Sequence, residues 1–383
     1  LMKLTINSNY PSVADLRKRA RAKIPKFAFD YLDGGCNEDV NLNKNRSDLR
    51  KIELMPHYLS KFDQVEMETT LFGHTYDAPF GIAPIGLQGL IWPNAPEILA
   101  KAALKHNIPF ILSTVSTESI ERIGELTEGK AWFQLYHPAD EKVTKDILKR
   151  VEEAGLPVLV ILADVPSFGY RPRDIRNGLS MPPKMTVSNI VNVLKRPHWS
   201  LKTLLNGQPN FETLKPYMPK NLSLNQLAKF MDSTFDGRLN EEKIKRIRDL
   251  WKGKLVIKGT ESLHDIKKAV DLGLDGVIIS NHGGRQVDAG QATIDSLKTI
   301  YPVYKDKITI MMDSGIRGGA DIARVMSCGA NFTFLGRTFM YGVSALGING
   351  GNHTIEMLNK QLTQVMDQLS CAEIDDLKKM LVS

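Results

Sequence analysis

The feature that most constrains the fold is a strand-then-helix pattern that recurs along the chain. A short apolar run, rich in β-branched residues, is followed by a glycine or polar turn and then by a helix-like stretch. Eight such runs occur, at residues 80–83, 109–112, 131–135, 158–162, 255–257, 276–279, 308–311 and 332–335. Eight successive βα units predict an α/β fold, a TIM (β/α)₈ barrel. The alternative, a doubly wound sheet, more usually has five or six strands.

The spacing of the runs places the remaining elements. Residues 163–254 separate the fourth run from the fifth, which predicts a long insertion after strand four, and residues 12–33 predict a helical extension before the barrel. The 383 residues are 42% hydrophobic and 24% charged, which excludes a disordered or coiled-coil chain. Because no linker or low-complexity tract divides the sequence, we expect one domain over residues 1–383.

The net charge of +7 is concentrated in one segment. Residues 184–230 hold seven Lys or Arg residues and one acid, Glu212, so they carry +6 of the total. This basic insertion is either a solvated loop or a surface for an anionic membrane. Nucleic acid is not expected as a partner, because no recognised binding motif accompanies the charge.

The cysteines and histidines limit the other possibilities. Cys36, Cys328 and Cys371 are scattered and form no CxxC motif, so we expect a reducing, cytoplasmic compartment. We expect no metal, because no His/Cys cluster has ligand spacing. No apolar run approaches the roughly 20 residues that a membrane-spanning helix needs.

In a barrel of this kind, functional residues lie just after the strands, at the C-terminal face. Polar side chains, glycines and a proline follow every predicted strand. In chain order they are Pro84, Gly86, Ser113, Gln134, Tyr136, Asp164, Arg171, Lys258, His282, Arg285, Asp313, Gly336 and Arg337.

The stretch SNHGGRQVD, residues 280–288, is the most distinctive. His282 suits general-base chemistry near neutral pH, and Arg285 suits bidentate binding of a carboxylate. A lone His–Arg pair is more often a surface turn, but its place after a buried strand favours a site. Asp164 is either a helix cap or the group that orients the histidine.

Two glycine-rich loops follow strands seven and eight, where such barrels usually bind phosphate. They contain Gly315 and Arg317 in one loop and Gly336 and Arg337 in the other. Lys258, at the end of a buried strand, needs a negative partner such as a phosphate, a carboxylate or a reduced cofactor ring. The residues therefore predict a phosphorylated cofactor, a base and a carboxylate clamp. A serine hydrolase is not expected, because no G-x-S-x-G motif is present.

These motifs resemble the family of FMN-dependent enzymes that oxidise L-2-hydroxy acids, which includes glycolate oxidase, L-lactate dehydrogenase and mandelate dehydrogenase. The resemblance runs from residue 25 to about residue 371. Besides residues 280–288 it rests on IAPIG (82–86), LST (112–114), FQLY (133–136), VIKG (256–259), DSGIRGGAD (313–321) and FLGR (334–337).

The resemblance implies oxidation of a lactate- or mandelate-like L-2-hydroxy acid to the 2-oxo acid, with FMN as cofactor. It implies that His282 is the base, that Asp164 stabilises it, and that Lys258 lies beside the flavin. The substrate contacts are then Tyr31, Tyr136, Arg171 and Arg285. The other flavin contacts are Pro84, Gly86, Ser113, Gln134, Asp313, Gly315, Arg317, Gly336 and Arg337. The electron acceptor, quinone or O₂, stays open, and a non-redox FMN-binding barrel is the alternative.

The sequence departs from the family pattern at several positions. Leu162 replaces a threonine that contacts the flavin, and Leu32 replaces a second tyrosine. Val115 stands where plant glycolate oxidase has tryptophan, which leaves room for a larger substrate group. Residues 165–170 also differ from the common pattern.

Residues 195–201 resemble the segment that anchors membrane-associated lactate and mandelate dehydrogenases, in which quinone takes the electrons. The resemblance implies peripheral association with the inner face of the cytoplasmic membrane. The alternative is a lid that packs on the barrel. Relatives are often tetrameric, so a homo-oligomer is expected.

Overall fold

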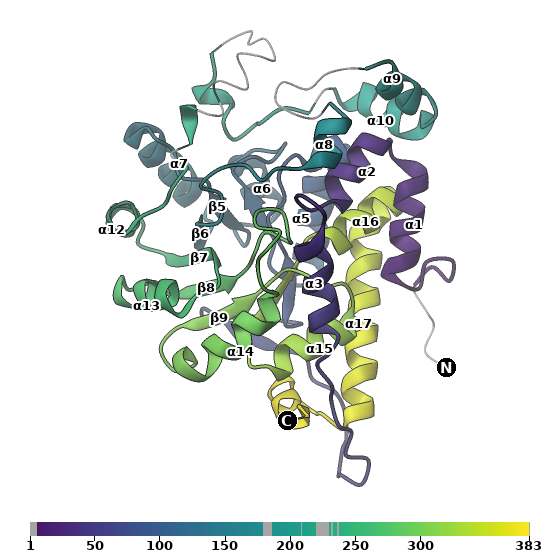
Figure 1. The fold of residues 1–383 in the computed structure, drawn as a ribbon, viewed down its shortest axis with the longest axis vertical. Coiled ribbons are helices and arrows are strands. Elements are labelled where there is room, and N and C mark those ends of the chain that lie inside the picture. The colour runs from purple at the N-terminus through teal and green to yellow at the C-terminus, as the bar shows by residue number, and fades with distance from the viewer. Residues whose placement is uncertain are drawn as a thin grey trace.

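Eight parallel strands form a barrel in the computed structural model (Figure 1), which describes residues 6–178, 186–207, 209–219, 230, 233–235 and 237–382. The strand order is β3-β10-β9-β8-β7-β6-β5-β4, and a parallel bridge from Ile82 to Phe110 joins the first strand to the last. The strands are β3 Phe80–Ile82, β4 Ile111–Ser113, β5 Trp132–Leu135, β6 Val158–Leu162, β7 Lys254–Thr260, β8 Gly276–Ile279, β9 Thr309–Met312 and β10 Phe332–Leu335. Each contains residues of one predicted run, so the predicted TIM barrel is confirmed.

Helices surround the strands (Figure 1). In the βα units these are α4 Gln88–Ile91, α5 Ala95–Lys105, α6 Ile120–Leu126, α7 Glu141–Glu153, α12 Glu241–Leu250, α13 Leu263–Asp271, α14 Thr293–Tyr304, α15 Gly319–Ser327 and α16 Arg337–Leu346. The chain ends with η2 Gly347–Asn349, α17 Gly350–Leu369 and η3 Ile374–Met380. Helices α7 and α13 are amphipathic, because their apolar residues recur at helical spacing. Each helix buries its apolar face against the barrel and exposes its polar face.

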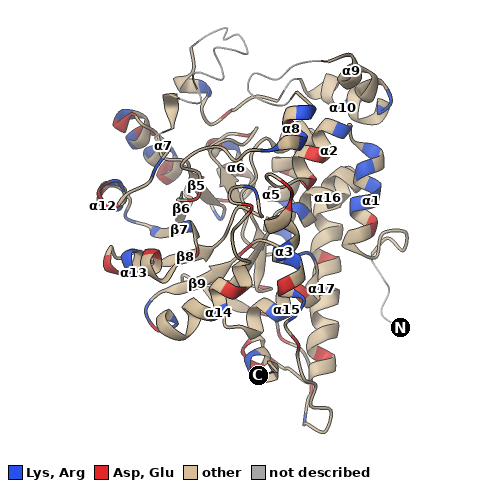
Figure 2. Ribbon diagram, in the orientation of Figure 1, with Lys and Arg blue, Asp and Glu red and all other residues tan. Residues whose placement is uncertain are grey.

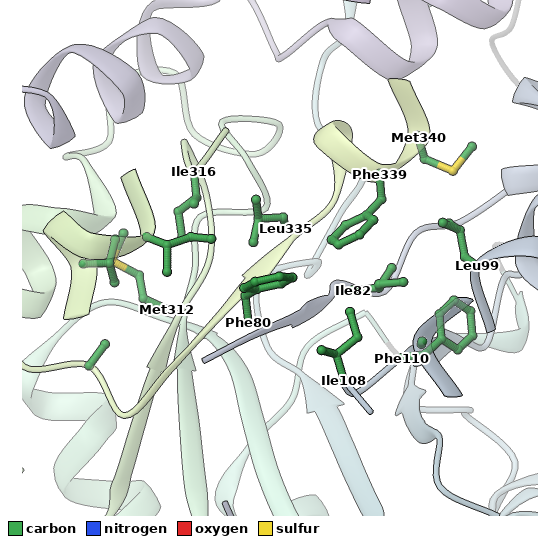
Figure 3. Close-up of a cluster of buried hydrophobic side chains, with 14 of the residues drawn as sticks. Phe80, Ile82, Leu99, Ile108, Phe110, Met312, Ile316, Leu335, Phe339 and Met340 are labelled. Atoms are coloured by element: carbon green, nitrogen blue, oxygen red, sulfur yellow. The ribbon is translucent and has the colours of Figure 1, made fainter. Parts of the chain in front are cut away.

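The core has two layers, which follow from the alternation of side chains along each strand. On β10, Phe332 and Phe334 point into the barrel, whereas Leu335 packs in the outer layer between strands and helices. Figure 3 shows this outer layer, in which Phe80 and Ile82 of β3 lie close to Phe339 of α16. Both faces of the strands are buried, which is why they read as continuous apolar runs.

A short hairpin, β1 Thr69–Leu71 and β2 His74–Tyr76, was not predicted from the sequence. Its Leu71 and Tyr76 belong to the same buried cluster as the side chains inside the barrel. Trp132 Nε1 lies 3.3 Å from the Tyr76 hydroxyl. The hairpin therefore contributes to the core inside the barrel.

The helical extension predicted at residues 12–33 is present in the structure. It forms two helices, α1 Val13–Lys23 and α2 Lys26–Asp33, which are separated at Pro25 because proline cannot donate a helical hydrogen bond. A capping box between Ser12 and Asp15 begins α1. A third helix, α3 Val40–Leu49, precedes the hairpin.

The predicted insertion after the fourth barrel strand lies between β6 and β7. Its described part contains α8 Pro172–Arg176, α9 Val187–Leu194, α10 Pro197–Asn206 and η1 Lys215–Tyr217. Trp199 of α10 anchors this part on the protein, because its indole is buried, donates to Ile91 O at 2.9 Å and packs edge-on against Phe27. Three of the basic residues counted in the sequence, Lys184, Lys220 and Lys229, lie outside the described residues.

Candidate active site

A cavity of about 500 Å³ opens where the barrel strands end. It brings together most of the residues that the sequence singled out. Those that line it are Tyr31, Pro84, Gly86, Tyr136, Arg171, Lys258, His282, Arg285, Asp313, Gly315, Arg317, Gly336 and Arg337. The expectation that these loops converge at one rim is thus met in the structure.

Three predicted site residues do not line this cavity. Ser113 and Gln134 are buried at the ends of β4 and β5, where they face each other in register. Asp164 does not line the cavity itself, but it is hydrogen-bonded to His282, which does. The flavin contacts assigned to Ser113 and Gln134 stay predictions.

His282 and Asp164 form a hydrogen-bonded pair at the cavity. Nδ1 of His282 lies 3.0 Å from Oδ1 of Asp164. Burial lowers the pKa of His282 and outweighs the opposing effect of Asp164. Burial of Asp164 works against its charge, but His282 and Lys258 hold the pKa of this carboxyl below its usual value. The site therefore pairs a neutral imidazole at pH 7 with an ionised carboxylate, which suits proton abstraction.

The local backbone enforces this pair. His282 has φ +58°, the left-handed region that few non-glycine residues adopt. Gly259, with φ +93°, leaves room for the Asp164 carboxyl, since a Cβ there would lie 2.4 Å from its carboxyl carbon. Gly259, near the end of β7, is thus required because Asp164 approaches the backbone so closely.

Lys258 is buried on the cavity wall and stays charged. Its Nζ lies 3.2 Å from Asp313 Oδ2 and donates to Ser280 Oγ at 2.9 Å. Burial opposes the charge, but Asp313 and Asp164 raise the pKa of Lys258 above its usual value. The negative partner expected from the sequence is thus a pair of carboxylates, and the ammonium is fixed beside the cavity.

Two guanidinium groups lie near His282. Arg285 donates to Tyr31 O at 2.7 Å and to Leu32 O at 2.8 Å, and it lies over the Tyr31 ring. Nε of Arg171 is buried without a hydrogen-bond partner among the described residues, and Asp174 lies 3.9 Å from its guanidinium. Burial and the charge of Arg171 lower the pKa of Arg285. A carboxylate between these guanidinium groups would offset their repulsion and satisfy the orphaned donor.

Two more guanidinium groups lie at the loops after β9 and β10, those of the half-buried Arg317 and the buried Arg337. Arg337 donates to the carbonyl oxygens of Leu32, Gly34 and Gly283, at 3.1, 2.7 and 3.0 Å. Within the described residues, neither Arg337 nor Arg317 forms an ion pair with a carboxylate. Burial, with the neighbouring arginines, lowers the pKa of Arg337 well below its usual value.

Withdrawing cations from water without an ion pair is costly, so this corner favours an anion. Two glycines shape the backbone at this corner. Gly315 adopts φ +83° and packs so closely on Asn45 that a Cβ would lie 2.6 Å from the Asn45 carbonyl oxygen. At Gly336 the nearest atom to a Cβ would be 3.7 Å away, in Ile85. Arginines and glycine amides at the start of α16 form a donor set that fits the phosphate of FMN.

Some cavity residues were not assigned a role from the sequence. They include Asp174, Ile175 and Phe211, whereas Leu32, Val115, Phe168 and Tyr170, which also line the cavity, had been noted as departures from the family pattern. Ile175 and Phe211 come from the insertion, and no local motif marks them, because only the fold of a long loop brings them to the cavity. Leu162 is buried and pairs with Lys258 in the β6–β7 register, and it does not line the cavity.

The sequence model of the FMN-dependent dehydrogenase family matches residues 20–383. The chain belongs to this family. An L-lactate dehydrogenase of Vibrio parahaemolyticus is 35% identical over 366 residues, covering 95% of this chain and 96% of that protein. One of Caulobacter is 32% identical over 373 residues, covering 97% and 98%.

Solved structures agree with this assignment. A monotopic membrane protein, (S)-mandelate dehydrogenase, superposes with a TM-score of 0.92 at 32% identity, covering 98% of this chain and all of that one. A mandelate oxidase gives a TM-score of 0.83 at 28% identity, covering 97% and 98%. The predicted family, the barrel and the FMN-dependent oxidoreductase chemistry are thus confirmed.

Proposed function

We propose that this member of the FMN-dependent dehydrogenase family oxidises an L-2-hydroxy acid to the 2-oxo acid, with His282 as the base. The observation that carries the proposal is that His282, paired with Asp164, and the half-buried guanidinium groups of Arg171 and Arg285 face one cavity. Bound FMN would supply the two-electron acceptor. The names of the similar proteins, L-lactate and (S)-mandelate dehydrogenases, support the same substrate class.

Different residues of the cavity bind the substrate and take its proton. Arg171 and Arg285 bind the substrate carboxylate, and the hydroxyl of Tyr31 or Tyr136 donates a hydrogen bond to the substrate. Tyr136 suits a donor, since burial together with Asp164 raises its pKa and keeps the phenol protonated. His282 then takes a proton from the substrate, and Asp164 stabilises the imidazolium that forms.

Lys258, with the loops after β9 and β10, would hold the cofactor. Its ammonium suits the position where negative charge develops on a reduced flavin, because a fixed cation there stabilises that charge. Pro84 and Gly86 would lie against the ring. The ribityl chain and phosphate would be held by Asp313, Gly315, Arg317, Gly336 and Arg337.

The substrate's side chain would lie against an apolar wall. Leu32, Val115 and Phe168 line the cavity, and Val115 Cγ2 would be only 2.8 Å from a Cβ at Gly86. A valine at this place leaves more volume than a tryptophan would. We therefore propose a lactate- or mandelate-like substrate over glycolate.

The insertion supports contact with a membrane surface. Exposed apolar side chains cover α9 and α10, including Leu194, Leu201, Leu204 and Leu205, and Leu204 is 79% exposed. Lys195, Arg196 and Lys202 lie among them in the sequence, and Figure 2 shows further Lys and Arg residues on the neighbouring α1. This combination suits an element that lies in the interface of an anionic bilayer. Within the described residues no helix is long and apolar enough to cross a membrane.

We propose that the protein binds the bilayer from one side and passes its electrons to a membrane quinone. The test compares turnover with a quinone analogue and with O₂ as the only acceptor, with and without anionic vesicles. Faster turnover with the quinone supports the proposal. Equal or faster turnover with O₂ would make the protein an oxidase instead, and a flavin that no L-2-hydroxy acid reduces would favour the non-redox alternative.

A further inference from the structure

The end of α2 holds a buried carboxylate, Asp33, which the proposed chemistry does not use. We propose that Asp33 is a positioning residue that fixes the end of α2 so that it orients Arg285 and Arg337. The inference rests on the proposed function, because these two arginines are assigned there to the substrate carboxylate and the FMN phosphate.

Asp33 is held from three other elements. Arg17 of α1 binds it in bidentate fashion, with Nε 2.6 Å from Oδ1 and NH2 2.7 Å from Oδ2. Tyr341 of α16 donates its hydroxyl to Oδ1 at 2.6 Å, and Arg173 of α8 lies 3.3 Å from Oδ2. Figure 1 shows α1, α2, α8 and α16 close together at this corner of the barrel. Asp33 thus joins the N-terminal extension, the insertion and the last barrel helix at one point.

The carbonyl groups on either side of Asp33 face the cavity arginines. Arg285 donates to Tyr31 O and Leu32 O, and Arg337 donates to Leu32 O and Gly34 O. These carbonyls are at the C-terminal end of α2, where the helix dipole favours cations. A shift of this helix end would therefore move both guanidinium groups at once.

The charge of Asp33 matters as well as its shape. Only 7% of the residue is exposed, so burial works against ionisation, but Arg17, Tyr341 and Arg337 hold the pKa of Asp33 far below its usual value. An ionised Asp33 accepts at both oxygens, whereas an amide would keep one accepting oxygen and present two N–H donors at the other position. Asp33→Asn therefore keeps the volume and loses the bidentate ion pair with Arg17.

The matched control is on the same helix. Asp30 accepts from Lys26 and from Asn177. Among the described residues, its side chain forms no hydrogen bond with Arg285 or Arg337. Asp30→Asn removes the same charge from α2 without disturbing the contacts of Asp33. Tyr341→Phe is a milder second variant, because it removes only the hydroxyl that donates to Asp33.

The experiment has two readouts on the FMN-loaded protein, besides melting temperature. FMN release is measured by flavin fluorescence after dialysis, and the KM and kcat for an L-2-hydroxy acid are measured with FMN in excess. For Asp33→Asn we expect the FMN dissociation constant and the KM both to rise about tenfold, the change that one lost charge-assisted contact produces. We expect kcat to stay within about threefold, because His282 is untouched.

Tyr341→Phe should change both constants in the same direction by a smaller factor, and Asp30→Asn should change neither. If Asp33→Asn does not fold, Tyr341→Phe carries the test. A variant that melts earlier but keeps both constants within twofold would show a structural role alone and overturn the proposal. A wild-type flavin that no hydroxy acid reduces would instead overturn the proposed function, and FMN release would still report on Arg337.

Discussion

His282 and Asp164 lie 118 residues apart in the chain, yet Nδ1 of one is 3.0 Å from Oδ1 of the other. The loop after β8 supplies the imidazole and the segment after β6 supplies the carboxylate. β7 lies between these strands, and its Gly259 leaves the space through which the carboxyl reaches the imidazole. The proposed base is therefore assembled by three neighbouring strands and not by any local motif.

Replacing this imidazole should remove most of the turnover without removing the cofactor. We expect His282→Gln to lower kcat by about 10²–10⁴-fold, the contribution of a positioned general base. The flavin absorbance of the purified variant should be unchanged. His264→Gln is the control, because His264 also pairs with an aspartate, Asp265 at 3.1 Å, but on the exposed surface of α13. Equal activity of wild type and His282→Gln would refute the assignment of the base.

The pH profile follows from the directions of the pKa shifts. The free enzyme needs a neutral His282, so kcat/KM should rise with pH through the pKa of this group and then level off. Because burial lowers that pKa, the midpoint should lie below 6.5. Asp164 acts in the opposite direction, so Asp164→Asn should move the midpoint to still lower pH while it reduces the rate. A midpoint above 6.5 in the wild type would contradict the assignment of His282.

Much of the barrel could be predicted because its strands are buried on both faces. Runs such as 158–162 stand out for that reason, and β6 has the same bounds, Val158–Leu162. The hairpin β1–β2 was missed because each strand has three residues and buries only its last. The break at Pro25 could have been predicted from the fixed φ of proline.

The site was predictable only where residues follow strands directly. His282, Lys258 and Asp313 are placed by the barrel itself, and they lie where the strand ends require. Ile175 and Phe211 reach the same cavity from the insertion, whose path depends on long-range packing such as that of Trp199. No local pattern encodes such a path.

The size of the side chain at Val115 should set substrate preference. We expect Val115→Trp to lower kcat/KM for mandelate relative to glycolate by more than about tenfold, because the ring fills the space that we assign to the substrate's side chain. Val303→Trp is the control, since Val303 is exposed on α14 and does not line the cavity. Kinetics with both acids measure the ratio, and an unchanged ratio would place the side chain elsewhere.

The exposed leucines of the insertion should account for membrane binding. We expect the triple change Leu194→Gln, Leu204→Gln and Leu205→Gln to lower binding to anionic vesicles by more than about tenfold, because apolar area is no longer buried in the bilayer. The control changes three exposed apolar residues outside the insertion, Leu59, Leu263 and Ile348, to glutamine. Vesicle sedimentation measures binding, and added salt should weaken it. Equal binding by both triple variants would contradict the proposed surface.

The central claim is that the cavity holds a flavin which an L-2-hydroxy acid reduces with the help of His282. The most direct measurement is the visible spectrum of the purified protein, mixed without oxygen with L-lactate, L-mandelate or glycolate. We predict that the flavin band bleaches with at least one of these acids, and much more slowly in His282→Gln. A flavin band that persists with every acid, or that bleaches equally fast in both proteins, would contradict the claim.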